Sequence, residues 1–220
     1  MRQDSQESGT ASGTQATATE RAAPIDGRRR RSERTRQLII EAFLLIVRET
    51  SQAPTAAQVA DRAGYSVRSI FERFPDLGAL RLAVTDRAIT EARAEATPVD
   101  LSADRTTRLK ERVATRARIC DKWLPLWRVM SAHDETSPEM RSRVKLIREL
   151  VMDQFDAVFR PELSSLPETE HRHTLIAMEA MTDFESWARM REYFDLSYDE
   201  AGAVWFDALD ALLPETPAVS

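Results

Sequence analysis

The sequence predicts an all-α protein. Glycine is scarce, with 6 in 220 residues, apolar residues recur at helical rather than strand-like spacing, and cap residues mark several helix starts. An apolar content of 42% is ordinary for a chain that buries a core. No apolar run is long enough to span a bilayer, and the N-terminus lacks the apolar stretch of a secretory signal. A single cysteine, Cys120, excludes an internal disulfide, so we expect a cytoplasmic protein with no membrane partner.

The first 27 residues are polar and low in complexity, which predicts a disordered tail over 1–27. A basic run follows, consisting of Arg28, Arg29, Arg30 and Arg31. We expect this run to contact DNA phosphates or to reach the minor groove, and the alternative is a solvated tail that only aids solubility. The first helix is expected over 32–49, where an apolar stripe runs along one side: Leu38, Ile39, Ala42, Phe43, Ile46 and Val47.

Residues 55–80, TAAQVADRAGYSVRSIFERFPDLGAL, are the most informative stretch. Thr55 and Gln58 have capping-box spacing and predict a helix over 55–62. Gly64 suits the left-handed conformation that ends a helix, and Ser66 suits the N-cap of a second helix over 67–73. Two short helices joined by a tight turn form a helix-turn-helix. The apolar positions expected to face inward are Val59, Ala63, Ile70 and Phe74.

This motif predicts contact with double-stranded DNA. Val67, Arg68 and Ser69 occupy the first turn of the second helix, which meets base edges in such motifs. Arg68 is the candidate for direct readout of guanine, and Thr55 and Ser66 are candidates for phosphate contacts. Residues 28–74 carry ten Lys/Arg and five Asp/Glu, although the whole chain has a net charge of −5. A basic head on an acidic body is expected when only the head touches phosphate.

The remaining helices follow from their start and stop signals. Pro75-Asp76 precedes a helix over 77–96 that would connect a DNA-binding domain at 28–76 to a second domain at 77–214. Within that second domain we expect a helix over 102–121, with Pro125 kinking or splitting it from a segment that reaches His133. A helix over 138–159 would follow, capped by Ser137 and stopped by Pro161. We then expect a long helix to 193, started by a Ser165–Glu168 capping box, and a last helix to 213, started by Ser197 and Glu200.

The head resembles the DNA-binding domain of the tetracycline-repressor (TetR) type of transcriptional regulator. The positions that carry the resemblance are Thr55, Val59, Ala60, Ala63, Gly64, Tyr65, Ser66, Ser69, Ile70, Phe71, Arg73, Phe74, Asp76 and Leu80. The resemblance implies that Phe71 and Arg73 also lie at the DNA. The chain departs from the family pattern there, because the family usually has Tyr in place of Phe71 and His in place of Arg73. It also has Leu77 and Gly78 where the family has Lys-Glu.

The last two predicted helices are apolar on more than one face, which predicts a homodimer built as a four-helix bundle. The resemblance implies the same assembly, and the alternative is that both faces are satisfied within one chain. The expected interface residues are Met181, Phe184, Trp187, Trp205, Leu209 and Leu212.

Large, soft or aromatic side chains gather in the middle helices and are candidates for a pocket that binds a largely apolar effector. The alternative is an ordinary core. The candidates are Trp123, Trp127, Met130, Met152, Phe155, Met178, Met181 and Phe184.

Other chemistry has little support in the sequence. His133, His171 and His173 lack the spacing that would converge on a metal ion, so no metal or other cofactor is expected. Cys120 lies in an apolar helix, where it is either a buried small hydrophobe or a redox sensor. No glycine-rich phosphate loop and no nucleophile-base arrangement is recognisable, so we do not expect an enzyme.

These observations predict a sequence-specific DNA-binding regulator, a repressor that a small ligand releases from a palindromic operator. An activator, or a constitutive repressor without an effector, is a rival within the same class. A helical dimer that binds a ligand or protein and no longer reads DNA is a rival of another class.

Overall fold

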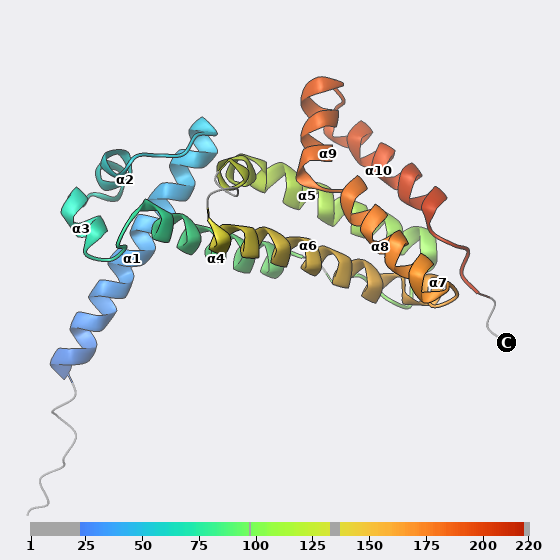
Figure 1. The fold of residues 1–220 in the computed structure, drawn as a ribbon, viewed down its shortest axis with the longest axis horizontal. Helices are drawn as coiled ribbons and strands as arrows, with labels where there is room; N and C mark the ends of the chain where they lie inside the picture. Colours follow the sequence, from blue (N-terminus) through green and yellow to red (C-terminus); the bar gives the residue numbers. More distant parts are fainter. Residues whose placement is uncertain (1–22, 97, 133–136, 218–220) are drawn as a thin grey trace, which may run out of the picture. The chain divides into compact units, whose positions relative to one another are not determined.

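The computed structural model describes residues 23–96, 98–132 and 137–217, and every regular element within them is helical. The all-α prediction is therefore confirmed. The chain divides into two compact units, residues 1–37 and 38–220. Figure 1 shows the elements, which are α1 (Ala23–Thr50), α2 (Ala56–Ala63), α3 (Val67–Phe71), α4 (Leu77–Glu95), α5 (Arg105–Ser131), α6 (Pro138–Val158), α7 (Arg160–Leu163), α8 (Glu168–Met181), α9 (Phe184–Ala188), a π-helical turn (Arg189–Tyr193) and α10 (Tyr198–Leu212).

Helix α1 begins at Ala23, nine residues before the predicted start. Residues 1–22 of the expected disordered tail lie outside the described residues, and 23–27 are helical rather than disordered. Proline is tolerated in a first helical turn, so Pro24 does not prevent the early start. Arginine is a good helix former, and adding residues to an existing helix avoids the cost of a new nucleus. Side-chain bonds within this stretch include Arg31 Nε to the Gly27 carbonyl at 3.2 Å.

The helix-turn-helix forms through the local signals predicted for it. Thr55 Oγ1 accepts from the Gln58 amide at 3.3 Å and Gln58 Oε1 accepts from the Thr55 amide at 2.8 Å, so the capping box is confirmed. Gly64 has φ of 72°, the left-handed conformation, and Ser66 caps α3 by accepting from the Ser69 amide at 3.1 Å. Helix α3 ends at Phe71, two residues earlier than predicted. The chain must leave the helical conformation before Pro75, which explains the early end.

A small apolar core fixes these helices. Val59 of α2 and Ile70 of α3 are fully buried, as are Phe74 after α3 and Leu80 of α4, whereas Ala63 is only half-buried. The later part of α1 covers this core with buried side chains at Ile39, Ala42, Phe43, Ile46 and Val47.

An ion pair on the surface also joins α2 to α1. Arg62 holds Glu49 in a bidentate pair at 2.8 and 2.6 Å. The position of α3 is therefore set by packing against α1, α2 and α4 rather than by its own short length.

Helix α5 runs unbroken from Arg105 to Ser131 with Pro125 inside it, so of the two predicted effects, a kink or a split, the split does not occur. A proline inside a helix removes one backbone hydrogen bond and costs about 3 kcal/mol. Packing along both sides of the proline outweighs that loss, since Leu109, Ala117, Trp123 and Trp127 of this helix are all buried.

Beyond α5, helix α6 ends at Val158, within one residue of the predicted end, and Pro161 lies in the first turn of the short α7. Two other predictions are wrong at particular residues. Ser165 forms no capping box with Glu168, because its hydroxyl donates to the Glu162 carbonyl at 2.7 Å. The long helix to 193 breaks after Met181, where Asp183 starts α9 by accepting from the Ser186 amide at 2.7 Å.

The predicted start of the last helix is confirmed. Ser197 Oγ accepts from the Glu200 amide at 3.2 Å, and Glu200 Oε2 accepts from the Ser197 amide at 2.8 Å. This capping box places α10 against α5 and α8. The Ser137 cap and Pro138 start of α6 are confirmed as well.

A buried ion pair ties α5 to α7. Arg108 donates to Glu162 at 2.6 and 3.1 Å, and the two residues are 3% and 0% exposed. Burial alone would raise the pKa of Glu162, but hydrogen bonds from Arg108 and Thr216 hold its pKa below the ordinary value. The carboxylate therefore stays ionised and also secures the segment after α10 through the Thr216 hydroxyl.

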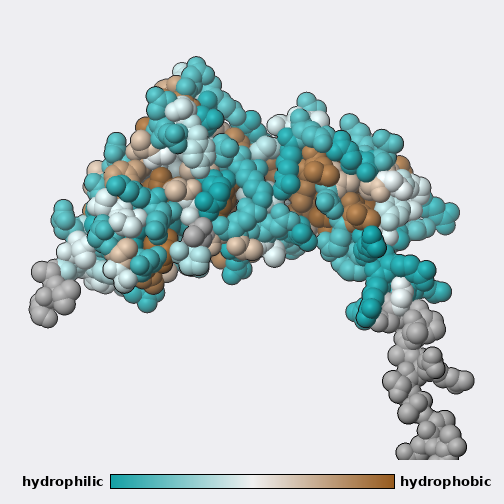
Figure 2. All heavy atoms as spheres, turned by 180° about the vertical axis from the view of Figure 1, so that it is seen from behind, coloured by the Kyte–Doolittle hydropathy of each residue, from teal (hydrophilic) through white to brown (hydrophobic). Residues whose placement is uncertain are grey.

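The surface is mainly hydrophilic on the face in Figure 2, with hydrophobic side chains gathered in a few places. In the described ranges, none of the helices is both long enough and apolar enough for a membrane crossing.

Replacing Gly64 with alanine should destabilise the protein. A side chain at φ of 72° suffers a clash between Cβ and the backbone that costs about 1–2 kcal/mol. We expect the free energy of unfolding, measured by denaturant titration, to fall by about that amount. Gly27→Ala is the control, since a Cβ there meets nothing within 4 Å in a helix that favours alanine. A Gly64→Ala protein as stable as the parent would contradict this account of the turn.

Candidate DNA-binding and ligand sites

Helix α3 presents a mixed polar and apolar face to solvent. Val67 is 40% exposed and Phe71 is 44% exposed, while the Arg68 side chain is 88% exposed. Ser69 is half-buried, and its hydroxyl lies 3.0 Å from that of the capping Ser66. An exposed arginine flanked by apolar side chains suits a groove that offers both acceptor atoms and thymine methyl groups.

The charge on Arg68 is held by a weak partner. Its Nε lies 3.1 Å from Glu72 one turn later. Exposed pairs at this spacing contribute only about 0.3–0.5 kcal/mol. Arg68 can therefore leave Glu72 for a stronger acceptor at little cost.

The other residues predicted to contact DNA differ in their exposure and in the hydrogen bonds they already make. Thr55 and Ser66 are exposed at helix N-termini, where amide groups favour phosphate. Arg73 is directed at its own backbone, since it donates to the Ser69 carbonyl at 2.9 Å and its Nε is buried without a partner. Arg28, Arg29, Arg30 and Arg31 are exposed on the first turns of α1, in the unit formed by residues 1–37.

A cavity of about 80 Å³ lies among α4, α5, α6 and the start of α9. Four of the predicted ligand-binding residues line it: Trp123, Trp127, Met130 and Phe184. Trp127 and Phe184 stack with ring centroids 4.7 Å apart, and Trp127 Nε1 donates to Glu185 at 2.6 Å. This stacked pair forms a rigid apolar wall.

The other four predicted ligand-binding residues lie elsewhere. Met152 lies in a surface depression between α6 and α8, and Met178 is fully buried in the core. Phe155 is buried beneath Arg112, with the guanidinium carbon 4.9 Å from the ring centroid. Met181 lies in a groove beside Val204 and Trp205. An apolar side chain in a helix serves the core and a pocket equally well, so composition alone could not separate them.

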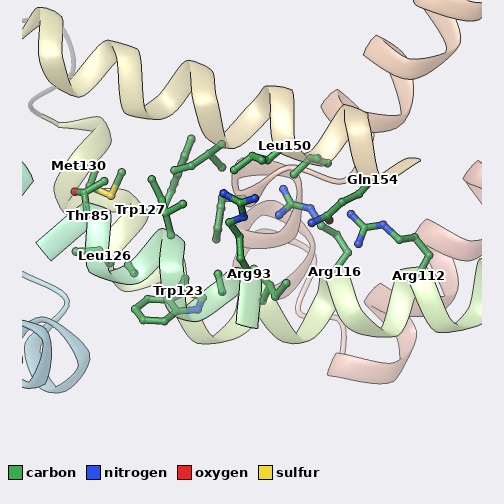
Figure 3. Close-up of a pocket in the computed structure, with 17 residues that line it drawn as sticks. Thr85, Arg93, Arg112, Arg116, Trp123, Leu126, Trp127, Met130, Leu150 and Gln154 are labelled. Atoms are coloured by element: carbon green, nitrogen blue, oxygen red, sulfur yellow. The ribbon is translucent and has the colours of Figure 1, made fainter. Parts of the chain in front are cut away.

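Three arginines line the cavity and were not predicted. Figure 3 shows Arg93 of α4 and Arg112 and Arg116 of α5 with their guanidinium groups directed into the same space. A signal was present in the sequence, since Arg108, Arg112 and Arg116 recur every four residues beside the apolar Leu109, Val113 and Ala117. That spacing places a row of charge on the buried side of one helix.

Each arginine of this row lies over an aromatic ring. Arg108 lies 5.6 Å from the Phe159 centroid, Arg112 lies 4.9 Å from that of Phe155, and Arg116 lies 5.2 Å from that of Phe184. Arg108, Arg112 and Arg116 are 3–4% exposed. Burying a charge is costly unless hydrogen-bonding partners replace water, so the partners of each member matter.

The partners differ along the row. Arg108 has the Glu162 carboxylate, and Arg116 Nε donates to the Thr182 carbonyl at 2.9 Å. Arg112 has neither, for its Nε is buried without a hydrogen-bond partner and no described residue forms an ion pair with it. Burial, reinforced by the like charge of Arg116, lowers the pKa of Arg112 to about 9. The site therefore holds one positive group whose charge is poorly compensated.

Four of the six predicted dimer-interface residues lie in the core of their own chain. Phe184, Trp187, Trp205 and Leu209 are buried within their own chain, at 5%, 0%, 2% and 0% exposure. Trp187 and Trp205 pack with ring centroids 4.9 Å apart, and their indole N–H groups donate to Asp121 and Ser186. The side chains that α8 and α10 leave at the surface include Ile176 at 42% and Val204 at 46% exposure, with Met181 and Leu212 half-buried.

Comparison with solved structures gives the fold. A TetR-family regulator from Streptomyces coelicolor superposes with a TM-score of 0.68 over 82% of this chain and 80% of its own, at 16% identity. A transcriptional regulator from Rhodococcus gives 0.63 over 82% and 95%, at 12% identity. The chain has the TetR-family fold. The multidrug binding protein EbrR, in complex with imidazole, gives 0.55 over 84% and 97%, at 19% identity. No protein-family model and no curated protein matches the sequence.

The histidines of this chain have ordinary surroundings. His171 Nε2 lies 2.7 Å from Asp156, and His173 is exposed. His133 lies outside the described residues. In the part of the chain that the structure describes, no cluster of three His, Cys, Asp or Glu residues could hold a metal ion.

The single cysteine of this TetR-type fold should be unreactive. Cys120 is 0% exposed, and burial raises the pKa of its thiol to about 11. The thiolate is the reactive form, so we expect negligible labelling of the folded protein by a disulfide reagent at neutral pH. One equivalent should react after unfolding in guanidinium, which is the internal control. Rapid labelling of the folded protein would instead support a redox-sensing thiol.

Proposed function

We propose that this protein is a sequence-specific DNA-binding transcription regulator whose affinity for its operator is controlled by a small ligand. The observation that carries the proposal is α3, a short capped helix with an exposed arginine, held on a fully buried apolar core. We assign DNA binding to residues 28–76, and ligand binding and dimerisation to 77–214.

DNA recognition would depend on the face of α3 that carries Arg68. Its guanidinium would exchange Glu72 for the acceptor atoms of guanine, and Val67 and Phe71 would contact neighbouring base edges. Thr55 and Ser66 would meet phosphates at the start of their helices. The arginine run at 28–31 would add phosphate contacts, so affinity should fall with salt.

Dimerisation would use the outer faces of α8 and α10. Ile176 and Val204 supply exposed apolar surface there, and Met181 and Leu212 border it. A two-fold axis through this surface would present one α3 helix from each protomer to DNA, so we expect a roughly palindromic operator.

Control by a ligand would act through α4 and Trp123. Helix α4 contributes Leu80 to the core of the DNA-binding head and Ala88 to the wall of the cavity. Trp123 lines the cavity too, and Arg48 of α1 lies 5.1 Å from its ring centroid. A ligand that displaced these groups would shift the head, and it would weaken DNA binding only by its difference in affinity for the two arrangements.

EbrR, which has the same fold, has been solved with malachite green as well as imidazole. We extend ligand control to this chain on the strength of its own cavity. Repression is the form of regulation we propose, within a cytoplasmic protein. An activator would use the same contacts at a different distance from the promoter.

Replacing Arg68 with alanine should relax sequence specificity. Loss of a bidentate arginine–guanine contact removes about 1–3 kcal/mol of discrimination at one base pair. Selection from random duplexes, followed by titration of the selected site and its single-base variants, would measure this. Arg172→Ala on α8, also an exposed arginine, is the control and should leave the preferred sequence unchanged. An unchanged preference in Arg68→Ala would favour the rival in which the head no longer reads DNA.

Replacing Ile176 and Val204 together with glutamate should yield monomers. Buried like charges in a symmetric interface are strongly unfavourable, and the dissociation constant measured by sedimentation should rise by about 10²-fold or more. Leu146→Glu on α6 is a matched control, because Leu146 is also 42% exposed but lies on a different helix. Dimers of unchanged affinity in the double variant would place the interface elsewhere.

A further inference from the structure

Arg112 differs from Arg108 and Arg116, its two neighbours in the row, in its hydrogen-bond partners. Arg108 is neutralised by Glu162, whereas Arg116 has the Thr182 carbonyl as an acceptor for its Nε but no carboxylate. Arg112 is equally buried, at 4% exposure, yet no described residue accepts a hydrogen bond from its guanidinium. Its charged group has the Phe155 ring on one side and lines the cavity.

The cavity is rich in donors and poor in acceptors. Among the described residues that line it there are three arginines and no carboxylate. Trp123 supplies a second unsatisfied donor, since its indole Nε1 is buried without a partner. An arginine carries five N–H donors and no acceptor, and the Nε of Arg112 is buried here without a partner.

Two acidic side chains beside Phe184, a residue of the cavity wall, have other partners. Asp183 accepts from the Ser186 amide at 2.7 Å and lies 3.7 Å from Arg148. Glu185 accepts from Trp127 at 2.6 Å. Neither forms an ion pair with Arg112 or Arg116, so the positive charge in the cavity is not cancelled by the protein.

We propose that the ligand of this cavity is an apolar molecule with a single anionic head group, bound as an ion pair by Arg112 and Arg116. This inference rests on the proposed ligand control and specifies the chemistry of the ligand. The head group supplies the missing acceptor for Arg112, and the fork of a guanidinium matches the two oxygens of a carboxylate. The apolar part lies along Trp127 and Leu150, and a cationic ligand is excluded by like charge.

The small volume of the cavity limits how much of the ligand it can hold. A cavity of about 150 Å³ is needed to hold benzene, and this one is about 80 Å³. A naphthyl or decyl group therefore fits wholly inside only if side chains that line the cavity move aside. Trp123 is one of these and it contacts Arg48, so the same movement reaches the DNA-binding head.

Two pairs of probes test the head-group requirement, one with an alkyl tail and one with an aromatic tail. They are decanoate against decanol, and 2-naphthoate against 2-naphthalenemethanol, each titrated into the full chain by calorimetry. A hydrogen-bonded charge pair at a buried site favours the acid by about tenfold or more in dissociation constant. We expect that preference in at least one pair. Equal affinity within both pairs, or no binding by either carboxylate at millimolar concentration, would overturn the proposal.

The variant Arg112→Met separates binding from folding. It should lower the preference for the carboxylate towards unity and raise the thermal unfolding midpoint by about 2–4 °C, because it removes a buried charge without a partner. Arg172→Met on α8 is the control and should change neither quantity. A variant that keeps the full preference would overturn the proposal. If the variant fails to fold, the comparison within each probe pair on the unaltered protein still decides.

Operator binding measured with the same probes distinguishes this inference from the proposed function. If the alcohols release DNA as well as the carboxylates do, the anionic requirement fails while ligand control stands. If the carboxylates bind through Arg112 but leave DNA affinity unchanged, the ligand assignment stands and ligand control fails.

Discussion

The second half of the fold depends on how α5 buries positive charge. An unpaired ionised group inside a protein is strongly destabilising, so each arginine on the inner side of this helix needs an ion-pair or hydrogen-bond partner. Arg108 has a carboxylate from α7 that also holds the segment after α10, and Arg116 has the carbonyl of Thr182, where α8 ends. These bonds position α7 and the break between α8 and α9. The remaining charge, on Arg112, faces a cavity and gives that cavity its chemical character.

Helix α4 also links the cavity to the helix-turn-helix. Helix α4 is continuous from Leu77 to Glu95, so its first turns belong to the core around α3 and its later turns to the cavity wall. Arg143 of α6 pairs with Asp86 at 3.0 Å and Lys122 of α5 pairs with Glu95, which hold α4 against both of its neighbours. A helix that is packed on two cores transmits displacement along its axis, because packed interiors resist local deformation.

Local signals predicted the capped helix starts well, and they failed where contacts with another helix decide the outcome. Thr55, Ser66, Ser137 and Ser197 each cap a helix as expected, since a cap depends on residues within one turn. Pro125 was expected to kink or divide α5 and does not divide it, because the packing of a 27-residue helix outweighs the one bond that a proline removes. Ser165 satisfies the spacing of a capping box but binds Glu162, a partner that only the adjacent α7 supplies.

The sequence by itself determined the helical class, the helix-turn-helix with Gly64 at its turn, and the exposed first turn of α3, since these depend on neighbours along the chain. Only the tertiary structure decided which apolar side chains serve the core, the cavity or the surface. Trp187 and Trp205 show this, because they pack on each other across α9 and α10 rather than facing a partner. It also decided which arginine of the α5 row lacks an acceptor. Partners from distant helices make that distinction, and no spacing within one helix contains it.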